Sequence, residues 1–447
     1  MSNVFKEDLH ENKVLRSFQL FFSKSTAGGI VLIIATAIAL FWSNSEWYES
    51  YKFLWKSPLT VTAFDITLFH HPFYYIVNDG LMVMFFFVVG LEIKRELLIG
   101  ELSSFRKAML PVIGAIGGVV GPVLIYRLIN MGDPAALDGW AIPMATDIAF
   151  ALGVLALLGD RVPVGIKVFL AALAIVDDLM AVLVIAFFYT SEIHFTWLYV
   201  GAIFAGFMFI LNRLKINNGW VYFFFGFGLW YCFLESGIHP TVAGVIGAFM
   251  IPARSVLGKD KFLKRTEALW GKFKQYFDKN KSNILNSHEE DTLHVIEKGV
   301  ERVQSPLHRL EVGIHPYTAF IILPIFALAN AGVYLGDFEL ADLTNKITLG
   351  IASGLFFGKI IGVSGAVWIA TKVGLASLPL GVKFSKIVAV SALCGIGFTM
   401  AIFIAGLSFK SGGSEEDYAK IGILIASTLA AVIGYIIMAN SLKDSKS

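Results

Sequence analysis

Long apolar segments recur along almost the whole chain, and their length limits what it can fold into. A helix needs about 20 predominantly apolar residues to cross a bilayer. Twelve runs are candidates: Ala27–Trp42, Ile76–Leu91, Ala108–Ile129, Trp140–Leu158, Val168–Tyr189, Trp197–Leu211, Trp220–Leu234, Thr241–Ile251, Tyr317–Leu335, Ile347–Ala370, Ile387–Leu407 and Ile421–Met438. Because helices satisfy their backbone hydrogen bonds internally, the runs predict an all-α polytopic membrane protein with twelve transmembrane helices.

Composition supports this class. The 447 residues are 56% hydrophobic and 16% charged, whereas soluble domains carry about 25% charged residues. A net charge of +2 is too small to suggest a nucleic-acid partner. Cys232 and Cys394 both lie in apolar runs, so no disulfide framework is predicted, and no cofactor is expected.

Basic residues are distributed unequally between the two sides of the membrane. With a cytoplasmic N-terminus, that side receives 29 Lys and Arg and the other side 6. Omitting the segment Arg254–Arg309 still leaves 17 against 6. Cytoplasmic loops are enriched in Lys and Arg, so both termini are expected in the cytoplasm. The predicted order is a leading segment (1–26), helices one to eight (27–252), a cytoplasmic loop (253–314), helices nine to twelve (315–440) and a tail (441–447).

Two stretches outside the apolar runs have patterns of their own. Leu59–Phe69 alternates apolar residues with Thr and Asp, which suits a β-hairpin on the far side, although an irregular loop fits as well. Arg254–Arg309 mixes 12 basic and 8 acidic residues. It is either an amphipathic cytoplasmic subdomain or a solvated tether.

Two adjacent carboxylates, Asp177 and Asp178, interrupt the apolar run Val168–Tyr189. An ionised Asp at the bilayer centre costs roughly 2.5–3.5 kcal/mol on insertion scales, so the pair needs a compensating partner. Lys359 lies midway along Ile347–Ala370 and supplies a cation, unless it extends to the interface. Neighbouring helix positions point about 100° apart. We therefore predict that Asp178 faces an ion and that Asp177 faces Lys359 or a second face of the cavity.

Two apolar runs contain signals for a broken helix. In the fourth, Pro143 is followed by Thr146 and Asp147, and proline removes a backbone donor. In the eleventh, Gly395 and Gly397 lie within Cys394–Met400. Interrupted helices in corresponding positions of two chain segments indicate the ion site of a transporter. Close helix packing is the alternative explanation for the glycines.

These groups can couple protons to a metal ion. Hard oxygen ligands from Asp178, Asp147 and Thr146 suit sodium or lithium, and the lack of clustered Cys and His argues against a transition metal. Burial penalises the charged forms of acids and bases, so such groups can titrate near neutral pH. A carboxylate cannot hold a proton and a sodium ion on the same oxygens. Competition at one site, exposed alternately to each side, is sufficient for antiport and predicts loss of transport at low pH.

Several motifs together resemble the NhaA family of bacterial sodium/proton antiporters, from about residue 18 to 440. They are Phe87–Leu97, Gly139–Pro143, Ala145–Gly153, Ala174–Asp178, Ser236–His239, Leu323–Gly332 and Gly395–Met400. The resemblance implies inverted-topology repeats with two discontinuous crossing helices in the inner membrane. It also implies electrogenic, pH-regulated exchange of cytoplasmic sodium or lithium for more than one external proton, and a homodimer joined partly through the 59–69 hairpin.

The resemblance also assigns roles to individual residues. Asp178 matches the essential ion- and proton-carrying carboxylate, Asp177 its partner, Lys359 the buried lysine, and Asp147 and Thr146 the crossing of the broken helices. The cytoplasmic-funnel and pH-response positions match Glu92, Arg95, Glu96, His239 and Glu311, and His315 is retained near them. The match departs at Val312, where the family often has His, and in the longer loop before it.

The residues alone leave alternatives open. Glu92–Glu96 also suits an interfacial charge cluster with i to i+4 pairing, and a lone His239 is more often a packed residue than a sensor. Asp79 suits an external entrance or a simple helix N-cap. A cation channel and an intramembrane aspartyl protease using Asp147 and Asp178 are the competing functions. A channel has no use for the lysine, and neither aspartate has the sequence context of such a protease.

Overall fold

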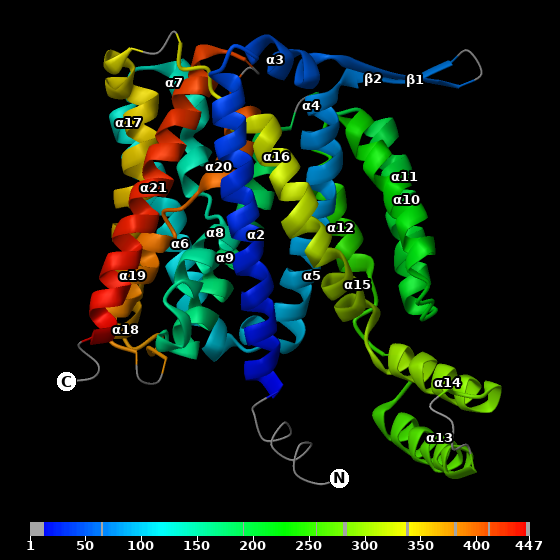
Figure 1. Ribbon diagram of the computed structural model, residues 1–447. Helices are drawn as coiled ribbons and strands as arrows, with labels where there is room; N and C mark the ends of the chain where they lie inside the picture. Colours follow the sequence, from blue (N-terminus) through cyan, green and yellow to red (C-terminus); the bar gives the residue numbers. More distant parts are fainter. Residues whose placement is uncertain are drawn as a thin grey trace.

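The computed structural model describes residues 13–63, 66–190, 192–255, 257–279, 284–336, 339–379, 382–409 and 412–443. They form one helical bundle, with a β-hairpin at one end and two further helices, α13 (Lys259–Lys279) and α14 (Ser287–Val303), at the other (Figure 1). We call these the hairpin end and the α13–α14 end. The first described helix, α2 (Lys13–Ser43), begins at the α13–α14 end, and the last, α21 (Ser414–Lys443), ends there.

Seven helices in the described part of the chain are long and apolar enough to cross a membrane. They are α4–η1–α5 (Phe73–Tyr75, Ile76–Leu81, Met82–Ile99), α6 (Phe105–Ile129), α9 (Val164–Phe188), α10 (Phe195–Arg213), α15–η5–α16 (Pro306–Tyr317, Thr318–Ile322, Leu323–Asn330), α17–η7–α18 (Lys346–Ser353, Gly354–Gly358, Lys359–Lys372) and α21. Three bent helix pairs raise the number to ten if each pair is one span. An all-α polytopic membrane protein is therefore confirmed.

The predicted number of twelve needs two more crossings, α11 (Gly219–Ser236) and the ten-residue α12 (Thr241–Met250), and stays a prediction. One boundary differs from expectation, because α15 begins at Pro306, inside the segment predicted as a loop. Its first turns carry charged and polar side chains, which hide the helix from a hydropathy window. Short 3-10 turns complete the connections: η2 (Glu101–Ser103), η4 (Gly159–Arg161) and η6 (Leu340–Thr344).

Both predicted breaks are present. The 3-10 helix η3 (Asp138–Met144), which follows α7 (Pro134–Leu137), meets α8 (Ile148–Ala156) at 46°, and α19 (Phe384–Leu393) meets α20 (Phe398–Ser408) at 47°. The breaks touch each other, because the backbone N–H of Asp147 donates to the carbonyl of Ile396 at 2.7 Å. The bend of α2 against α3 (Tyr48–Lys56) is the third, at 114°.

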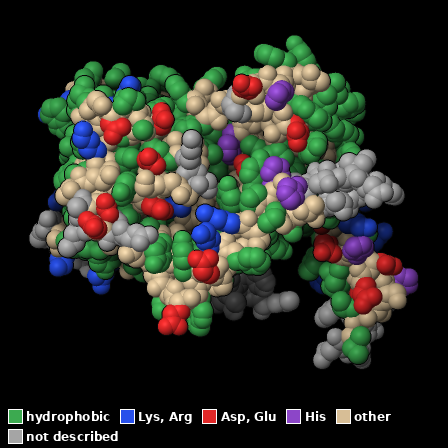
Figure 2. All heavy atoms as spheres, turned by 90° about the horizontal axis from the view of Figure 1, so that it is seen from above, with side chains coloured by type: hydrophobic (Ala, Val, Ile, Leu, Met, Phe, Trp, Pro, Cys, Tyr) green, Lys and Arg blue, Asp and Glu red, His purple; other side chains and the backbone are tan. Residues whose placement is uncertain are grey.

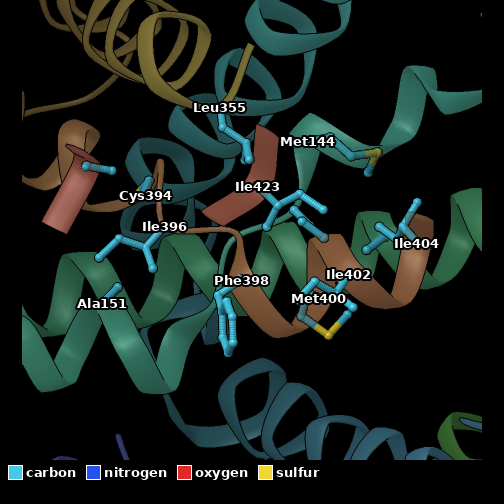
Figure 3. Close-up of a cluster of buried hydrophobic side chains, with 14 of the residues drawn as sticks. Met144, Ala151, Leu355, Cys394, Ile396, Phe398, Met400, Ile402, Ile404 and Ile423 are labelled. Carbon is cyan, nitrogen blue, oxygen red and sulfur yellow. The ribbon is translucent and has the colours of Figure 1, made fainter. Parts of the chain in front are cut away.

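The glycines of the second break allow the chain to come close to its neighbours. A Cβ on Gly395 would lie 2.7 Å from the carbonyl oxygen of Leu355, and one on Gly397 would lie 2.8 Å from the Leu355 side chain. Apolar side chains fill the space around the unwound segments, among them Leu355, Cys394 and Ile396 (Figure 3). Backbone polar groups at this depth are thus covered by protein rather than lipid.

Close packing of α6 against α18 positions Lys359. A Cβ on Gly117 or Gly362 would collide with the backbone carbonyl of the other residue, so these two glycines let the helices approach closely. Lys359 begins α18 directly after the π-helix η7, and its side chain is fully buried. The alternative that Lys359 extends to the membrane interface is therefore wrong.

The hairpin prediction is confirmed. Strands β1 (Pro58–Ala63) and β2 (Ile66–Pro72) pair antiparallel, with Pro58 opposite Pro72 and an irregularity between Val61 and Thr62. Residues 64–65, between the strands, lie outside the described part. The two strands extend sideways beyond the bundle (Figure 1).

The long segment after α12 contains two helices that lie beside each other below the bundle (Figure 1). Each carries its apolar side chains on one face, and α14 begins with a capping box in which Asn286 and Glu289 satisfy each other's backbone N–H. The amphipathic subdomain is thus correct, and a solvated tether is not.

Candidate ion-binding site at the crossing of two broken helices

Lys359 and Asp177 form a buried ion pair. The Nζ atom of Lys359 lies 2.6 Å from Oδ2 of Asp177, and both side chains are fully buried. The hydroxyl of Thr146 lies 2.8 Å from the same oxygen and 2.9 Å from the carbonyl of Cys394. Having one hydrogen, it donates to one of them at a time. The predicted contact between Asp177 and Lys359 is present.

Asp178 faces a different side of α9, toward a cavity of about 70 Å³. Its side chain is buried, yet no other described residue makes a hydrogen bond to its carboxylate. The cavity is also lined by Asp147, Thr399 and Glu92. Since one water needs about 10–15 Å³ by this measure, the space suits a small cation with a few waters.

Asp147 connects the two broken helices. One carboxylate oxygen caps α8 by accepting from the backbone N–H of Phe150 at 3.0 Å. The other accepts from the backbone N–H of Thr399 at 3.1 Å and from its hydroxyl at 2.6 Å. A carboxylate here also counters the positive ends of two helix dipoles. Because both oxygens accept hydrogen bonds, Asp147 is not the free second carboxylate that an aspartyl protease needs, although it still lines the cavity.

The threonine at the cavity differs from the predicted one. The predicted ligand set contained Thr146, but its hydroxyl is directed to Asp177, whereas Thr399 lines the cavity beside Asp147. Thr399 was missed as a site residue. The available signal was its place two residues after Gly397, in the second break.

Charged residues from α5 and α15 meet at the α13–α14 end of the cavity. The guanidinium of Arg95 lies 2.9 Å from Glu311 and 3.0 Å from Glu96, and Glu92 lies buried at the cavity wall. Lys94 instead donates to the carbonyls of Phe249 and Ile251 at the end of α12. The Arg95–Glu311 pair therefore joins α5 to α15, the Arg95–Glu96 pair joins adjacent residues of α5, and an interfacial cluster built from i to i+4 pairs is wrong.

Comparison with known proteins identifies the family. The family model described as Na+/H+ antiporter 1 matches residues 19–438. The chain belongs to this family. It is 46% identical to the Na(+)/H(+) antiporter NhaA 1 of Saccharophagus degradans over 95% of this chain and 91% of that protein. It is 46% identical to the NhaA of Koribacter versatilis, with the same coverage of both chains, and 44% identical to that of Vibrio cholerae, over 95% of this chain and 98% of the relative.

In this member of the Na+/H+ antiporter 1 family, the predicted pH-response residues do not form one group. His315 and Glu92 both line the cavity beside Asp178, which we call the inner cavity. Glu311 and Arg95 lie near them. His239 lies at the other end of the bundle, in the turn between α11 and α12. Grouping His239 with the cytoplasmic-funnel positions is therefore wrong, because helix order along the chain does not give depth in the membrane.

His239 and Asp79 line a second cavity, of about 310 Å³, at the hairpin end. We call it the outer cavity. Nε2 of His239 lies 3.4 Å from Oδ1 of Asp79, and Nδ1 lies 2.8 Å from the hydroxyl of Thr241. Asp79 lies inside the π-helix η1, so the N-cap alternative for it is wrong. Its position suits the predicted external entrance.

A Thr399→Val variant tests the connection between the broken helices. Valine keeps the shape of threonine but removes the hydroxyl that donates to Asp147. Hydrogen bonds to charged groups contribute about 1.5–3 kcal/mol, so the free energy of unfolding should fall by about that amount. Thermal unfolding of the purified protein measures it. Thr428→Val is the matched control, because Thr428 is exposed and bonds only within α21. Equal stability of the two variants would contradict the connecting role.

Proposed function

We propose that this protein extrudes cytoplasmic sodium or lithium in exchange for external protons, and that Asp178 carries both. The observation that supports this most is the contrast between the three buried aspartates. Asp147 and Asp177 are held by hydrogen bonds or by Lys359, whereas Asp178 is buried at a cavity without such a partner among the described residues. The relatives from Saccharophagus degradans and Koribacter versatilis are named Na(+)/H(+) antiporters, which also supports the proposal.

Competition at Asp178 couples the two ions. A sodium ion beside the carboxylate excludes a proton from the same oxygens, and Thr399 and Asp147 contribute further hard oxygens. The Asp177–Lys359 pair is a second place where protonation can change. Two such places permit more than one proton per sodium ion, which makes the exchange electrogenic.

The two broken helices are the proposed moving parts. Both meet at the site, and transporters commonly expose such a site alternately by moving one repeat against the other. The full proposal includes twelve crossings with inverted repeats, an inner-membrane location and cytoplasmic termini. The groups proposed to sense pH are Glu92, Arg95, Glu96, Glu311 and His315, which adjoin the inner cavity, and His239 at the outer one.

A homodimer is the proposed assembly. The hairpin carries two paired strands away from the bundle, so its backbone edges are available to a second copy at the membrane surface. Hydrophobic side chains lie along the rim of the bundle seen from the hairpin end (Figure 2), and the lipid bilayer is the expected surrounding of such exposed residues as Phe187 and Ile361.

Proton movement in everted membrane vesicles tests the function. Adding sodium or lithium to vesicles with a preformed pH gradient should dissipate the gradient above neutral pH, and the response should fade at acidic pH because the site stays protonated. Fluorescence of a pH-sensitive dye reports the gradient. Choline is the control cation, since its quaternary ammonium is much larger than sodium or lithium and cannot bring its charge as close to a carboxylate. The proposal fails if sodium and lithium behave like choline.

A further inference from the structure

The inner and outer cavities are separated by a thin wall. They share no lining residue in the described part of the chain, but three segments border both of them. These are α4–η1–α5, α15–η5–α16 and α20. On α20, Thr399 and Met400 line the inner cavity, whereas Ile402 and Phe403 line the outer one. Thr399 and Phe403 are four residues apart, which at a helical rise of 1.5 Å per residue is about one turn along α20.

Aromatic rings from the three segments fill this wall. The ring of Phe403 lies 5.6 Å from that of Phe86 on α5 and 6.1 Å from that of Phe326 on α16. Phe86 and Phe326 are fully buried, and Phe403 is 3% exposed. On the outer side the ring of His239 meets Phe403 edge-on at 5.4 Å. The wall itself is thus apolar, with the polar residues of the inner cavity on one side and His239 on the other.

The segments that carry these rings all contain a helix irregularity. Phe86 follows the π-helix η1, Phe326 follows the π-helix η5, and Phe403 lies in the half-helix after the second break. Such irregularities often occur at functional sites, and a helix can shift or bend there without losing its other hydrogen bonds. A small movement of α20 would therefore separate Phe403 from the two other rings.

We propose that Phe403, packed on Phe86 and Phe326, is the gate that closes the ion-binding cavity toward the hairpin end. Closed, the three rings leave no polar path for an ion between the two cavities. Open, they join Asp178 to the outer cavity with His239 and Asp79. This inference rests on the proposed function, since a gate matters only if ions reach Asp178 from both sides.

The test uses the full-length protein in proteoliposomes and measures two quantities. One is sodium-driven proton movement, which reports exchange, and the other is proton leak down an imposed pH gradient without sodium. Phe403→Cys removes the ring, so the leak should rise by about tenfold or more, equivalent to a barrier lowered by about 1.4 kcal/mol. Phe187→Cys is the matched control, because Phe187 is 77% exposed on the outside of α9.

Chemical restoration of the ring separates a gate from general damage. Benzyl methanethiosulfonate forms a disulfide with the introduced thiol, releases methanesulfinate and returns a phenyl ring to the wall on a side chain three atoms longer than that of Phe403. Modification should return the leak of Phe403→Cys to the level of the unsubstituted protein, which is treated in parallel because it retains the buried Cys232 and Cys394. Phe403→Leu, which keeps apolar bulk, should leak less than Phe403→Cys before modification.

The outcomes are distinct. A leak in Phe403→Cys no greater than that in Phe187→Cys, or one that modification leaves unchanged, would overturn the gate. A Phe403→Cys protein that does not fold is judged by Phe403→Leu, which must then leak more than Phe187→Cys. Absence of sodium-driven proton movement in the unsubstituted protein would instead refute the proposed function, whatever the leak.

Discussion

An Asp178→Asn variant is expected to lose sodium- and lithium-dependent proton movement down to the background of empty vesicles, while remaining folded. Asparagine has nearly the same shape but can neither release a proton nor offer a negative charge to a cation. Asp178 has no ion pair or hydrogen bond from the other described residues, so folding does not depend on its charge. Removing an unpaired buried charge should leave the melting temperature equal to or above that of the unsubstituted protein.

Two measurements check this prediction on the same preparation. Dye fluorescence in everted vesicles reports exchange, and thermal unfolding of the purified protein reports folding. Asp291→Asn is the matched control, because Asp291 lies exposed on α14, far from the inner cavity. Retained exchange in Asp178→Asn would refute the assigned role of Asp178. A loss of exchange in both variants would point to the preparation instead.

A Lys359→Ala variant is expected to be strongly destabilised. It removes the cation of a fully buried pair and leaves the carboxylate of Asp177 with the hydroxyl of Thr146 as its remaining partner among the residues that the structure describes. Breaking a buried pair from one side typically costs about 3–5 kcal/mol, because an uncompensated charge remains. Thermal unfolding of the purified protein should show this as a large fall in melting temperature.

The double variant Lys359→Met/Asp177→Leu distinguishes the loss of the ion pair from the cost of leaving one buried charge unpaired. With both charges removed and the volume kept similar, much of the lost stability should return, although exchange should not. Lys372→Ala is the control, since Lys372 is exposed at the end of α18 and contacts Trp368 only. An unchanged melting temperature and sodium affinity in Lys359→Ala would exclude the pairing as a structural element.

A contact of Lys359 with one of the two adjacent aspartates could be predicted from the free-energy cost of burying their charges, and helix geometry then separated the roles of Asp177 and Asp178. Burying each charge in an apolar run costs free energy, and a partner of opposite sign lowers that cost for both charges. The places of Thr146 and Thr399 could not be predicted in this way. Both are small hydroxyl residues beside a break, and only the crossing decides which of them reaches Asp147.

The depth of His239 is a second point that the sequence did not supply. The motif around His239 matches a family pattern but does not show which residues surround the side chain. Its neighbours Asp79 and Phe403 come from η1 and α20, far away along the chain. Depth depends on where α12 begins and on how the helices are tilted, and neither is a local property of the sequence.

The sequence by itself determined the membrane class, the two breaks and the three buried aspartates with their lysine. These follow from apolar run length, proline and glycine chemistry and the cost of burying charge, all of which are local. The tertiary structure supplied the reason why Asp178, of these three aspartates, has no ion pair or hydrogen bond with another described residue. Asp178 faces the cavity because Lys359, from a helix 182 residues away, takes Asp177, and because Thr399, 252 residues from Asp147, occupies that carboxylate. Such long-range pairing is set by how helices pack, which no short stretch of sequence encodes.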